Sequence, residues 1–224
     1  RSRGLGDVYK RQLYGVQMVH DAASGHPGGS MSCMDVLTYL YFAEMRVDPK
    51  NPHDPGRDRF VMSKGHCSPA MYPVLALRGF FPVEDLKMFR RIDGHMSGHV
   101  EMKYVPGVDM STGSLGQGIS VAVGMALAER MINAKFGDDL CSHYTYVING
   151  DGCLMEGISE EAVSLAGHLG LNKLIVLWDN NNITIDGTVD KANSTDQIKR
   201  FQAVGWNTIE IDGHDSVSYT HLRA

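Results

Sequence analysis

The chain contains 224 residues, of which 43% are hydrophobic and 21% are charged, and this length and balance are typical of a globular protein with one sizeable core. The formal net charge of -5 provides no broad basic surface, which argues against nucleic acid as a partner and requires any anionic ligand to be held by a local site. No apolar run approaches the roughly 20 residues of a membrane-spanning helix, so we expect no membrane partner.

Both ends of the chain depart from the patterning of their neighbours. Residues 1–12 and 216–224 do not continue the periodicity beside them, and we interpret them as non-native flanks that carry no information on the fold. The remaining residues, 13–215, are expected to form one domain that is truncated at its C-terminal end.

Hydrophobic periodicity divides residues 13–215 into helices and strands. In chain order, the sequence predicts a helix over 13–23, a break over 24–29, a helix over 32–43, a strand over 59–63, helices over 68–77, 82–89 and 118–134, a strand over 144–148, a helix over 159–169, a strand over 173–178, a helix over 196–204 and a strand over 206–211. Strands separated by helices imply an α/β fold with a mostly parallel sheet and helices on both faces. Ligands of such folds lie at the carboxyl ends of the strands.

The cysteines are widely spaced, and none belongs to a CxxC pair. They are Cys33, Cys67, Cys141 and Cys153. This spacing argues against a disulfide framework and a structural zinc site, and it favours a cytoplasmic location. Cys153 stands beside a Gly-Asp-Gly motif, but we expect it to be buried as packing rather than to react.

Polar residues follow two neighbouring strands where each strand ends. Gly150-Asp151-Gly152 follows the strand over 144–148, and Asp179-Asn180-Asn181-Asn182 follows the strand over 173–178. In a right-handed crossover the carboxyl ends of both strands lie at the same edge of the sheet, so Asp151 and Asn181 are expected to converge. Carboxylate and amide oxygens favour a hard cation such as Mg²⁺ or Ca²⁺, with positions left for water and ligand phosphates. The flanking glycines would expose backbone N–H groups to such a ligand.

Gly150-Asp151-Gly152 followed by Asn180-Asn181 resembles the metal and diphosphate motif of thiamine-diphosphate enzymes. Further segments occur in the order seen in transketolases: 24–28 (SGHPG), 58–66 (DRFVMSKGH), 111–118 (STGSLGQG), 155–157 (MEG) and 211–215 (IDGHD). The sequence is therefore similar to the N-terminal thiamine-diphosphate-binding (PP) domain of the transketolase family, or to the N-terminal subunit of a split transketolase.

The resemblance implies a set of residues for the metal and the diphosphate. Asp151, the side chain of Asn181 and the carbonyl oxygen of Ile183 match the ligands of a divalent metal, Mg²⁺ or alternatively Ca²⁺ or Mn²⁺. Gly152 matches a backbone contact to the diphosphate, Asn181 also counts as a cofactor contact, and His66 matches a histidine near the diphosphate.

The resemblance also implies contacts to the sugar and to the rest of the cofactor. His26 and His99 match histidines that contact the hydroxyls of the sugar donor and help to move protons, and with His66 they form the expected catalytic set. Neutral histidines suit proton transfer because their ordinary pKa is near 6.5. Gly113 and Leu115 match backbone positions beside the aminopyrimidine ring. His95 lies outside these motifs and is interpreted as structural.

A transketolase-like chain is expected to transfer a two-carbon ketol unit between sugar phosphates. The family needs a glutamate from a pyrimidine-binding domain, the C-terminal half, supplied in cis or as a separate subunit, and no segment here resembles it. The chain is therefore expected to be inactive without that partner half and to act in a homodimer or heterotetramer, where Glu156 matches an acid at the contact between halves. Two alternatives stay open: half of a deoxyxylulose-phosphate synthase or dihydroxyacetone synthase, and a catalytically inert fragment.

Overall fold

A computed structural model describes residues 8–215, so residues 1–7 and 216–224 of the two predicted flanks lie outside the described residues. The main elements are α1 (Val8–Ala22), α2 (Pro27–Ser32), α3 (Met34–Tyr39), β1 (Arg59–Met62), α4 (Ser68–Arg78), α5 (Gln117–Phe136), β2 (Thr145–Gly150), α6 (Asp151–Leu154), α7 (Gly157–Leu169), β3 (Leu174–Asp179), β4 (Ile183–Thr184), β5 (Gly187–Thr188) and α8 (Gln197–Ala203). A π-helix, η2 (Leu40–Glu44), extends α3, and short 3₁₀ turns are η3 (Gly65–Cys67), η4 (Val83–Met88) and η5 (Val189–Lys191).

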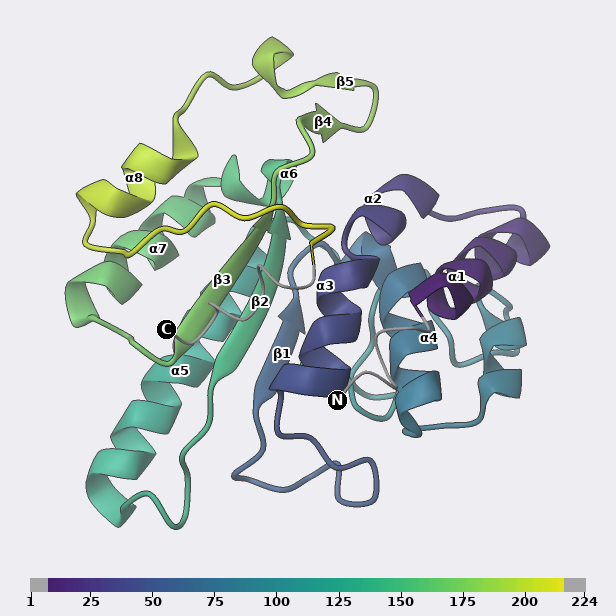
Figure 1. Ribbon diagram of the computed structural model, residues 1–224, viewed down its shortest axis with the longest axis horizontal. Coiled ribbons are helices and arrows are strands. Elements are labelled where there is room, and N and C mark those ends of the chain that lie inside the picture. The colour runs from purple at the N-terminus through teal and green to yellow at the C-terminus, as the bar shows by residue number, and fades with distance from the viewer. Residues whose placement is uncertain (1–7, 216–224) are drawn as a thin grey trace.

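A parallel sheet with the order β1-β2-β3 lies at the centre of the described residues (Figure 1). The predicted strands over 59–63, 144–148 and 173–178 are confirmed, and so is their parallel arrangement. The middle strand, β2, is buried along nearly its whole length, as expected for a strand covered on both faces. Gly150, at the end of β2, pairs in register with Asp179, at the end of β3.

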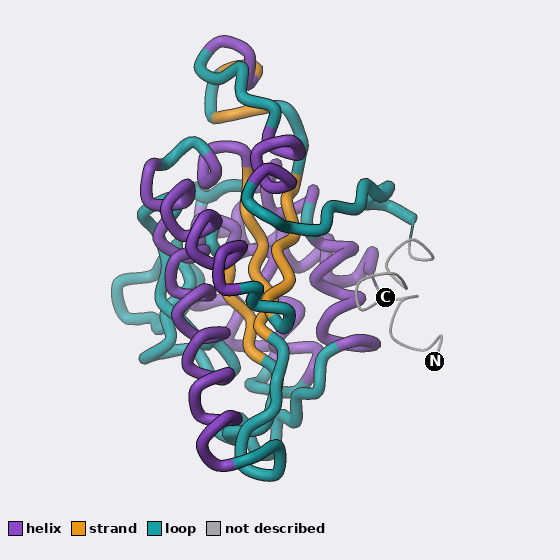
Figure 2. Tube along the Cα trace, turned by 90° about the vertical axis from the view of Figure 1, so that its left-hand side faces the viewer, coloured by secondary structure: helices purple, strands orange, loops and turns teal. Residues whose placement is uncertain are grey.

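Helices cover both faces of this sheet, as the sequence predicts (Figure 2). Phe60 and Tyr146 point to one face, where they share a core with residues of α1, α3 and α4. Their neighbours Val61 and Val147 point to the other face and pack with α5 and α7. Because side chains alternate along a strand, the short strands contribute to both cores.

Three predicted elements differ from the structure at their boundaries or type. The first helix begins at Val8 rather than at 13, and Arg11 is buried with its guanidinium 3.9 Å from the centre of the Phe42 ring. The predicted break over 24–29 already contains the start of α2, because Pro27 suits the first turn of a helix. The segment over 82–89 forms the 3₁₀ turns of η4. Whether 1–12 and 216–224 are non-native stays a prediction.

The predicted strand over 206–211 is wrong: these residues form no strand in the described part of the chain. The segment has the residue types of a strand, but those types favour a strand only where a neighbour offers backbone hydrogen bonds and a packed face. In Figure 1 it runs crosswise to β3 rather than alongside it, and no ladder forms between the two.

The cysteines are all free and buried, and Cys153 is buried as predicted. Within residues 8–215, no helix combines the length and the apolar character needed to span a bilayer.

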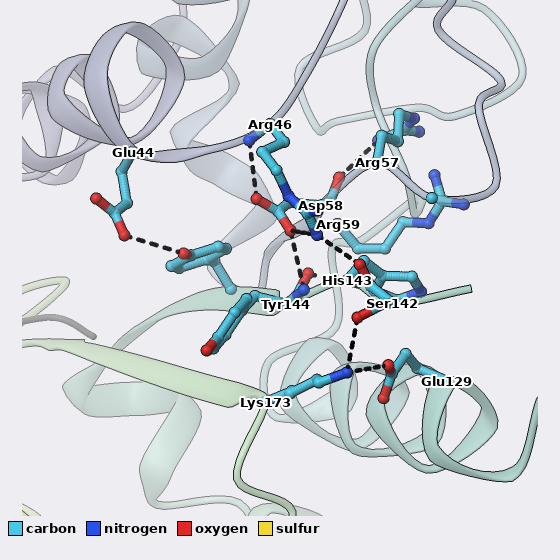
Figure 3. A network of polar contacts seen from close by, with 12 residues as sticks. Glu44, Arg46, Arg57, Asp58, Arg59, Glu129, Ser142, His143, Tyr144 and Lys173 are labelled. Atoms are coloured by element: carbon cyan, nitrogen blue, oxygen red, sulfur yellow. Dashed lines mark hydrogen bonds and ion pairs between the residues drawn. The ribbon is translucent and has the colours of Figure 1, made fainter. Parts of the chain in front are cut away.

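A polar network holds the amino ends of the three strands (Figure 3). Asp58, which precedes β1 and is fully buried, accepts hydrogen bonds from the backbone N–H of Arg46 at 2.8 Å and of Tyr144 at 2.9 Å. Lys173, which precedes β3, donates to Glu129 of α5 at 2.6 Å and to Ser142 at 3.1 Å. These bonds anchor the strands at their amino ends, the edge of the sheet opposite to Asp151 and Asn180.

We expect Asp58→Ala to lower the free energy of unfolding by about 2–4 kcal/mol, because two backbone N–H groups lose their buried acceptor. Urea denaturation followed by circular dichroism measures the change. Asp48→Ala is the matched control, since Asp48 is exposed and accepts one local bond from the Lys50 N–H. Equal stability of the two variants would contradict this role for Asp58.

Candidate cofactor and metal site

The ends of β2 and β3 bring two polar segments to the same edge of the sheet. Asp151 directly follows β2 as the first residue of α6, and Asn180 directly follows β3. The two strands end side by side because Gly150 pairs with Asp179, and α6 contacts β4, the strand that contains Ile183. Asp151, Asn181 and Ile183 therefore belong to adjoining segments.

Asp151 carries a buried carboxylate oxygen that has no hydrogen-bond partner among the described residues. Its side chain accepts a hydrogen bond from the Trp178 indole through Oδ1 at 3.0 Å, whereas Oδ2 is buried without a hydrogen-bond partner. Burial raises the pKa of Asp151, and the Trp178 indole and the backbone N–H groups of Asn182 and Asn181 partly offset that rise. A buried oxygen of this kind is costly unless a ligand or cation satisfies it, so Oδ2 fits a metal ligand.

The side chain of Asn181 is exposed and contacts its own loop rather than Asp151. Its Nδ2 group donates to Asp179 Oδ2 at 3.3 Å, and its Oδ1 accepts from the Ile183 N–H at 3.2 Å. Residues 8–215 contain no cluster of His, Cys, Asp and Glu that could hold a metal. A set made of one carboxylate, one amide and one backbone carbonyl instead fits a hard cation that keeps positions for water and phosphate oxygens.

Two glycines near this edge lie against side chains of other loops. A Cβ atom at Gly152 would lie 3.1 Å from Leu115 Cδ1, and one at Gly113 would lie 3.5 Å from the His99 ring. The loop before α5 is therefore packed between His99 and Gly152. Gly116, which precedes α5, has a φ of 80° that L-residues rarely adopt. This glycine allows the sharp turn that presents Gly113 and Leu115 toward the strand ends.

The three histidines predicted to be catalytic form one group. The rings of His26 and His66 meet edge to face with centroids 5.0 Å apart. Burial, followed by the neighbouring charges of His26, Lys64 and His99, lowers the pKa of His66 to about 4. Burial and the positive charges of Arg90 and His26 also lower the pKa of His99. Both shifts favour the neutral imidazole, the form that can accept a proton.

Sequence reasoning missed a buried lysine beside these histidines. Lys64 is 2% exposed, donates to the Gly29 carbonyl at 2.9 Å and forms an ion pair with Asp179. Its place after β1 was visible in the sequence, but no spacing rule indicates that its ammonium group points inward. His95, in contrast, is half-buried, with Nε2 3.5 Å from Asp85 Oδ2.

Comparison with known proteins identifies the family. Residues 8–222 match the family model described as "Transketolase, thiamine diphosphate binding domain". The chain belongs to this family. The predicted resemblance to transketolases is thereby confirmed, and the cofactors of this domain are thiamine diphosphate and a divalent metal ion.

Relatives and solved structures agree with this assignment. The chain is 52% identical over 198 residues to a transketolase of Cereibacter sphaeroides (88% of this chain, 30% of the relative) and 50% identical over 215 residues to one of Sinorhizobium medicae (95% and 31%). A crystal structure of a transketolase mutant (R525L) from Pichia stipitis superposes with a TM-score of 0.92 at 41% identity, covering 100% of this chain and 33% of that one. The crystal structure of the Campylobacter jejuni transketolase superposes with a TM-score of 0.90 at 39% identity, covering 97% of this chain and 34% of that one. The chain thus spans about a third of the length of these proteins.

We expect the neutral state of His66 to make stability depend on pH. The folded pKa is about 4, below the ordinary value near 6.5, so the unfolded chain binds the extra proton first as pH falls. The free energy of unfolding therefore decreases between pH 6.5 and 4. Denaturation of the wild type and His66→Gln at pH 7.5 and 5 measures the effect: the wild type should lose more stability than the variant. An equal loss in both proteins would contradict the burial of a neutral imidazole.

Proposed function

We propose that this chain is the cofactor-binding part of a transketolase, which transfers a two-carbon ketol unit between sugar phosphates once a pyrimidine-binding half is present. The observation that carries the proposal is the unpartnered oxygen of Asp151, located where β2 and β3 end together in a chain of this family. Solved transketolases of Pichia stipitis in complex with fructose 6-phosphate and sedoheptulose 7-phosphate support sugar phosphates as the substrate class.

The metal and the diphosphate are proposed to bind at the strand ends. Asp151, the Asn181 side chain and the Ile183 carbonyl would hold Mg²⁺, or Ca²⁺ or Mn²⁺ in its place, and the cation would neutralise the diphosphate in a chain with no broad basic surface. Gly152 would offer its backbone N–H to the diphosphate, and His66 would lie next to it. The absence of a Cβ at Gly152 supports a close approach, because Leu115 already occupies the adjoining space.

The histidines are proposed to handle the sugar. Bound thiamine diphosphate supplies the nucleophilic carbon that adds to the ketose carbonyl. His26 and His99 would contact the donor hydroxyls, and a neutral imidazole can take the proton of a hydroxyl and return it later. The lowered pKa of His99 supports this role, since a protonated ring could not act as the base. Gly113 and Leu115 would lie beside the aminopyrimidine ring.

The complete active unit is proposed to be larger than this chain. A C-terminal pyrimidine-binding half, in cis or as a separate subunit, would contribute the glutamate that activates the aminopyrimidine, with Glu156 at the contact between halves. A homodimer or a heterotetramer would place the cofactor between the halves. We further propose a cytoplasmic location and a place in carbohydrate metabolism, in the pentose phosphate pathway.

We expect Asp151→Ala to weaken the binding of thiamine diphosphate in the presence of Mg²⁺, because the cation loses the only carboxylate of the proposed site. Loss of a residue that merely supports a metal ligand typically weakens binding about 10–100-fold, and the loss here should be larger. Isothermal titration calorimetry measures the Kd. Asp190→Ala, which removes an exposed carboxylate from η5, should bind like the wild type. Unchanged binding by Asp151→Ala would refute the metal assignment.

Activity is expected only with the partner half. The reconstituted unit should convert xylulose 5-phosphate and ribose 5-phosphate, and His26→Ala and His99→Ala should each lower kcat about 10²–10⁴-fold, as is typical of general acid–base residues. A coupled spectrophotometric assay follows turnover. Preference for pyruvate or formaldehyde as a substrate would instead indicate a deoxyxylulose-phosphate or dihydroxyacetone synthase, and no turnover with a functional partner half would indicate an inert fragment.

A further inference from the structure

The ammonium group of Lys64 lies in the interior of the protein between the ends of two strands that are not neighbours. Lys64 follows β1, and its partner Asp179 ends β3, with β2 between them. The lysine side chain passes over the end of β2, where a Cβ atom at Gly150 would be 3.5 Å from Lys64 Cδ. Burial opposes the charge, but Cys33, Cys67 and Asp179 raise the pKa of Lys64 above its ordinary value, so the amine is protonated.

One carboxylate oxygen of Asp179 accepts several hydrogen bonds from side chains of this region. Asp179 Oδ2 accepts from Lys64 Nζ, from Ser32 Oγ of α2 at 2.5 Å and from Asn181 Nδ2 at 3.3 Å. In all of these bonds the carboxylate oxygen is the acceptor. It therefore attracts the NH₂ group of the Asn181 amide and not its oxygen, so that Oδ1 is directed to the other side.

The orientation of this amide matters for the proposed metal site. Only the oxygen of an asparagine side chain can bind a hard cation, and an amide that can rotate presents its nitrogen to the cation part of the time. In the structure Asn181 Oδ1 faces away from Asp179, toward the Ile183 N–H, within the same loop that would supply the Ile183 carbonyl. Asp179 thus selects the orientation of Asn181 that a metal site requires.

We propose that Lys64 is a positioning residue of the cofactor site: its buried ammonium holds the Asp179 carboxylate in place, and Asp179 holds the Asn181 amide with its oxygen available to the metal. This inference rests on the proposed function of Asn181 as a metal ligand. Lys64 would touch neither the cofactor nor the substrate.

A purely stabilising role accounts less well for this lysine. Burying an ion pair costs desolvation free energy, and apolar residues of similar size often give equal or higher stability. A buried charge pair is therefore better explained by a need for a hydrogen-bond acceptor in a fixed position, which Asp179 provides next to Asn181. Lys64 Nζ also bonds the Gly29 carbonyl at the start of α2, which ties the segment after His26 to the same carboxylate.

Three variants separate positioning from stability: Lys64→Met, Asp179→Asn and the double variant. Calorimetric titration of the chain with thiamine diphosphate and Mn²⁺ gives the Kd, and urea denaturation gives the stability. Both single variants leave a buried group without its partner and should lose stability, whereas the double variant removes both charges and should recover much of it. We expect the Kd to stay at least about tenfold weaker in all three variants. Lys64→Met leaves the Asp179 carboxylate without the ammonium group that holds it in place, and an asparagine at 179 can turn its own NH₂ group toward Asn181.

Lys173→Met is the matched control. Lys173 also pairs with a buried carboxylate, that of Glu129, but it lies at the amino end of the sheet (Figure 3). This variant should lose stability and keep the wild-type Kd. A double variant whose Kd returns to the wild-type value together with its stability would show that the pair acts through folding alone, and the inference would be wrong.

The result also separates this inference from the proposed function. A wild-type chain that fails to bind Mn²⁺ and thiamine diphosphate refutes the proposed function, and the role of Lys64 is refuted with it. A wild type that binds, an Asp151→Ala variant that does not, and a Lys64→Met variant that binds like the wild type would leave the proposed function intact and overturn only the role of Lys64.

Discussion

The in-register pairing of β2 with β3 is the constraint on which the rest of the site depends. Because Gly150 lies opposite Asp179, the chain leaves both strands at one level, and the segments that begin at Asp151 and Asn180 start as neighbours. A shift of the register by one residue would reverse the direction of every side chain in a strand. It would also separate the two segments along the strand axis. The backbone hydrogen bond from the Thr145 N–H to the Lys173 carbonyl, 2.9 Å long and located at the amino ends of the two strands, opposes such a shift.

The same constraint explains how a chain with a net negative charge can accommodate a diphosphate. The strand ends provide a carboxylate, backbone groups and small residues rather than a group of cations. Lys64, whose side chain lies beside the end of β2, is already paired with Asp179. A diphosphate at the proposed site would therefore be held through a metal ion, which agrees with the cofactors of the family.

The sequence was sufficient for the sheet and for the family, and it was insufficient for interactions between distant segments. The strand runs and the Gly-Asp-Gly motif are local signals, and they located β1, β2, β3 and Asp151 correctly. The burial of Lys64 depends on α2 and β3 closing around it, and no local pattern contains that information. The error at 206–211 has a related cause, because residue types indicate a capacity to form a strand and not the presence of a neighbour.

The hairpin that follows β3 differs from the core in how easily it opens. The amide groups of β2 are bonded on both sides and buried, so their hydrogens exchange with solvent only when the whole domain unfolds. The β4–β5 hairpin pairs two residues with two and is largely exposed, so it can open locally at little cost. Asp151 is thus presented by the most persistent part of the fold and Ile183 by one of the least persistent. In the proposed metal site, this difference would let the ion enter and leave through the hairpin while the Asp151 carboxylate stays in place.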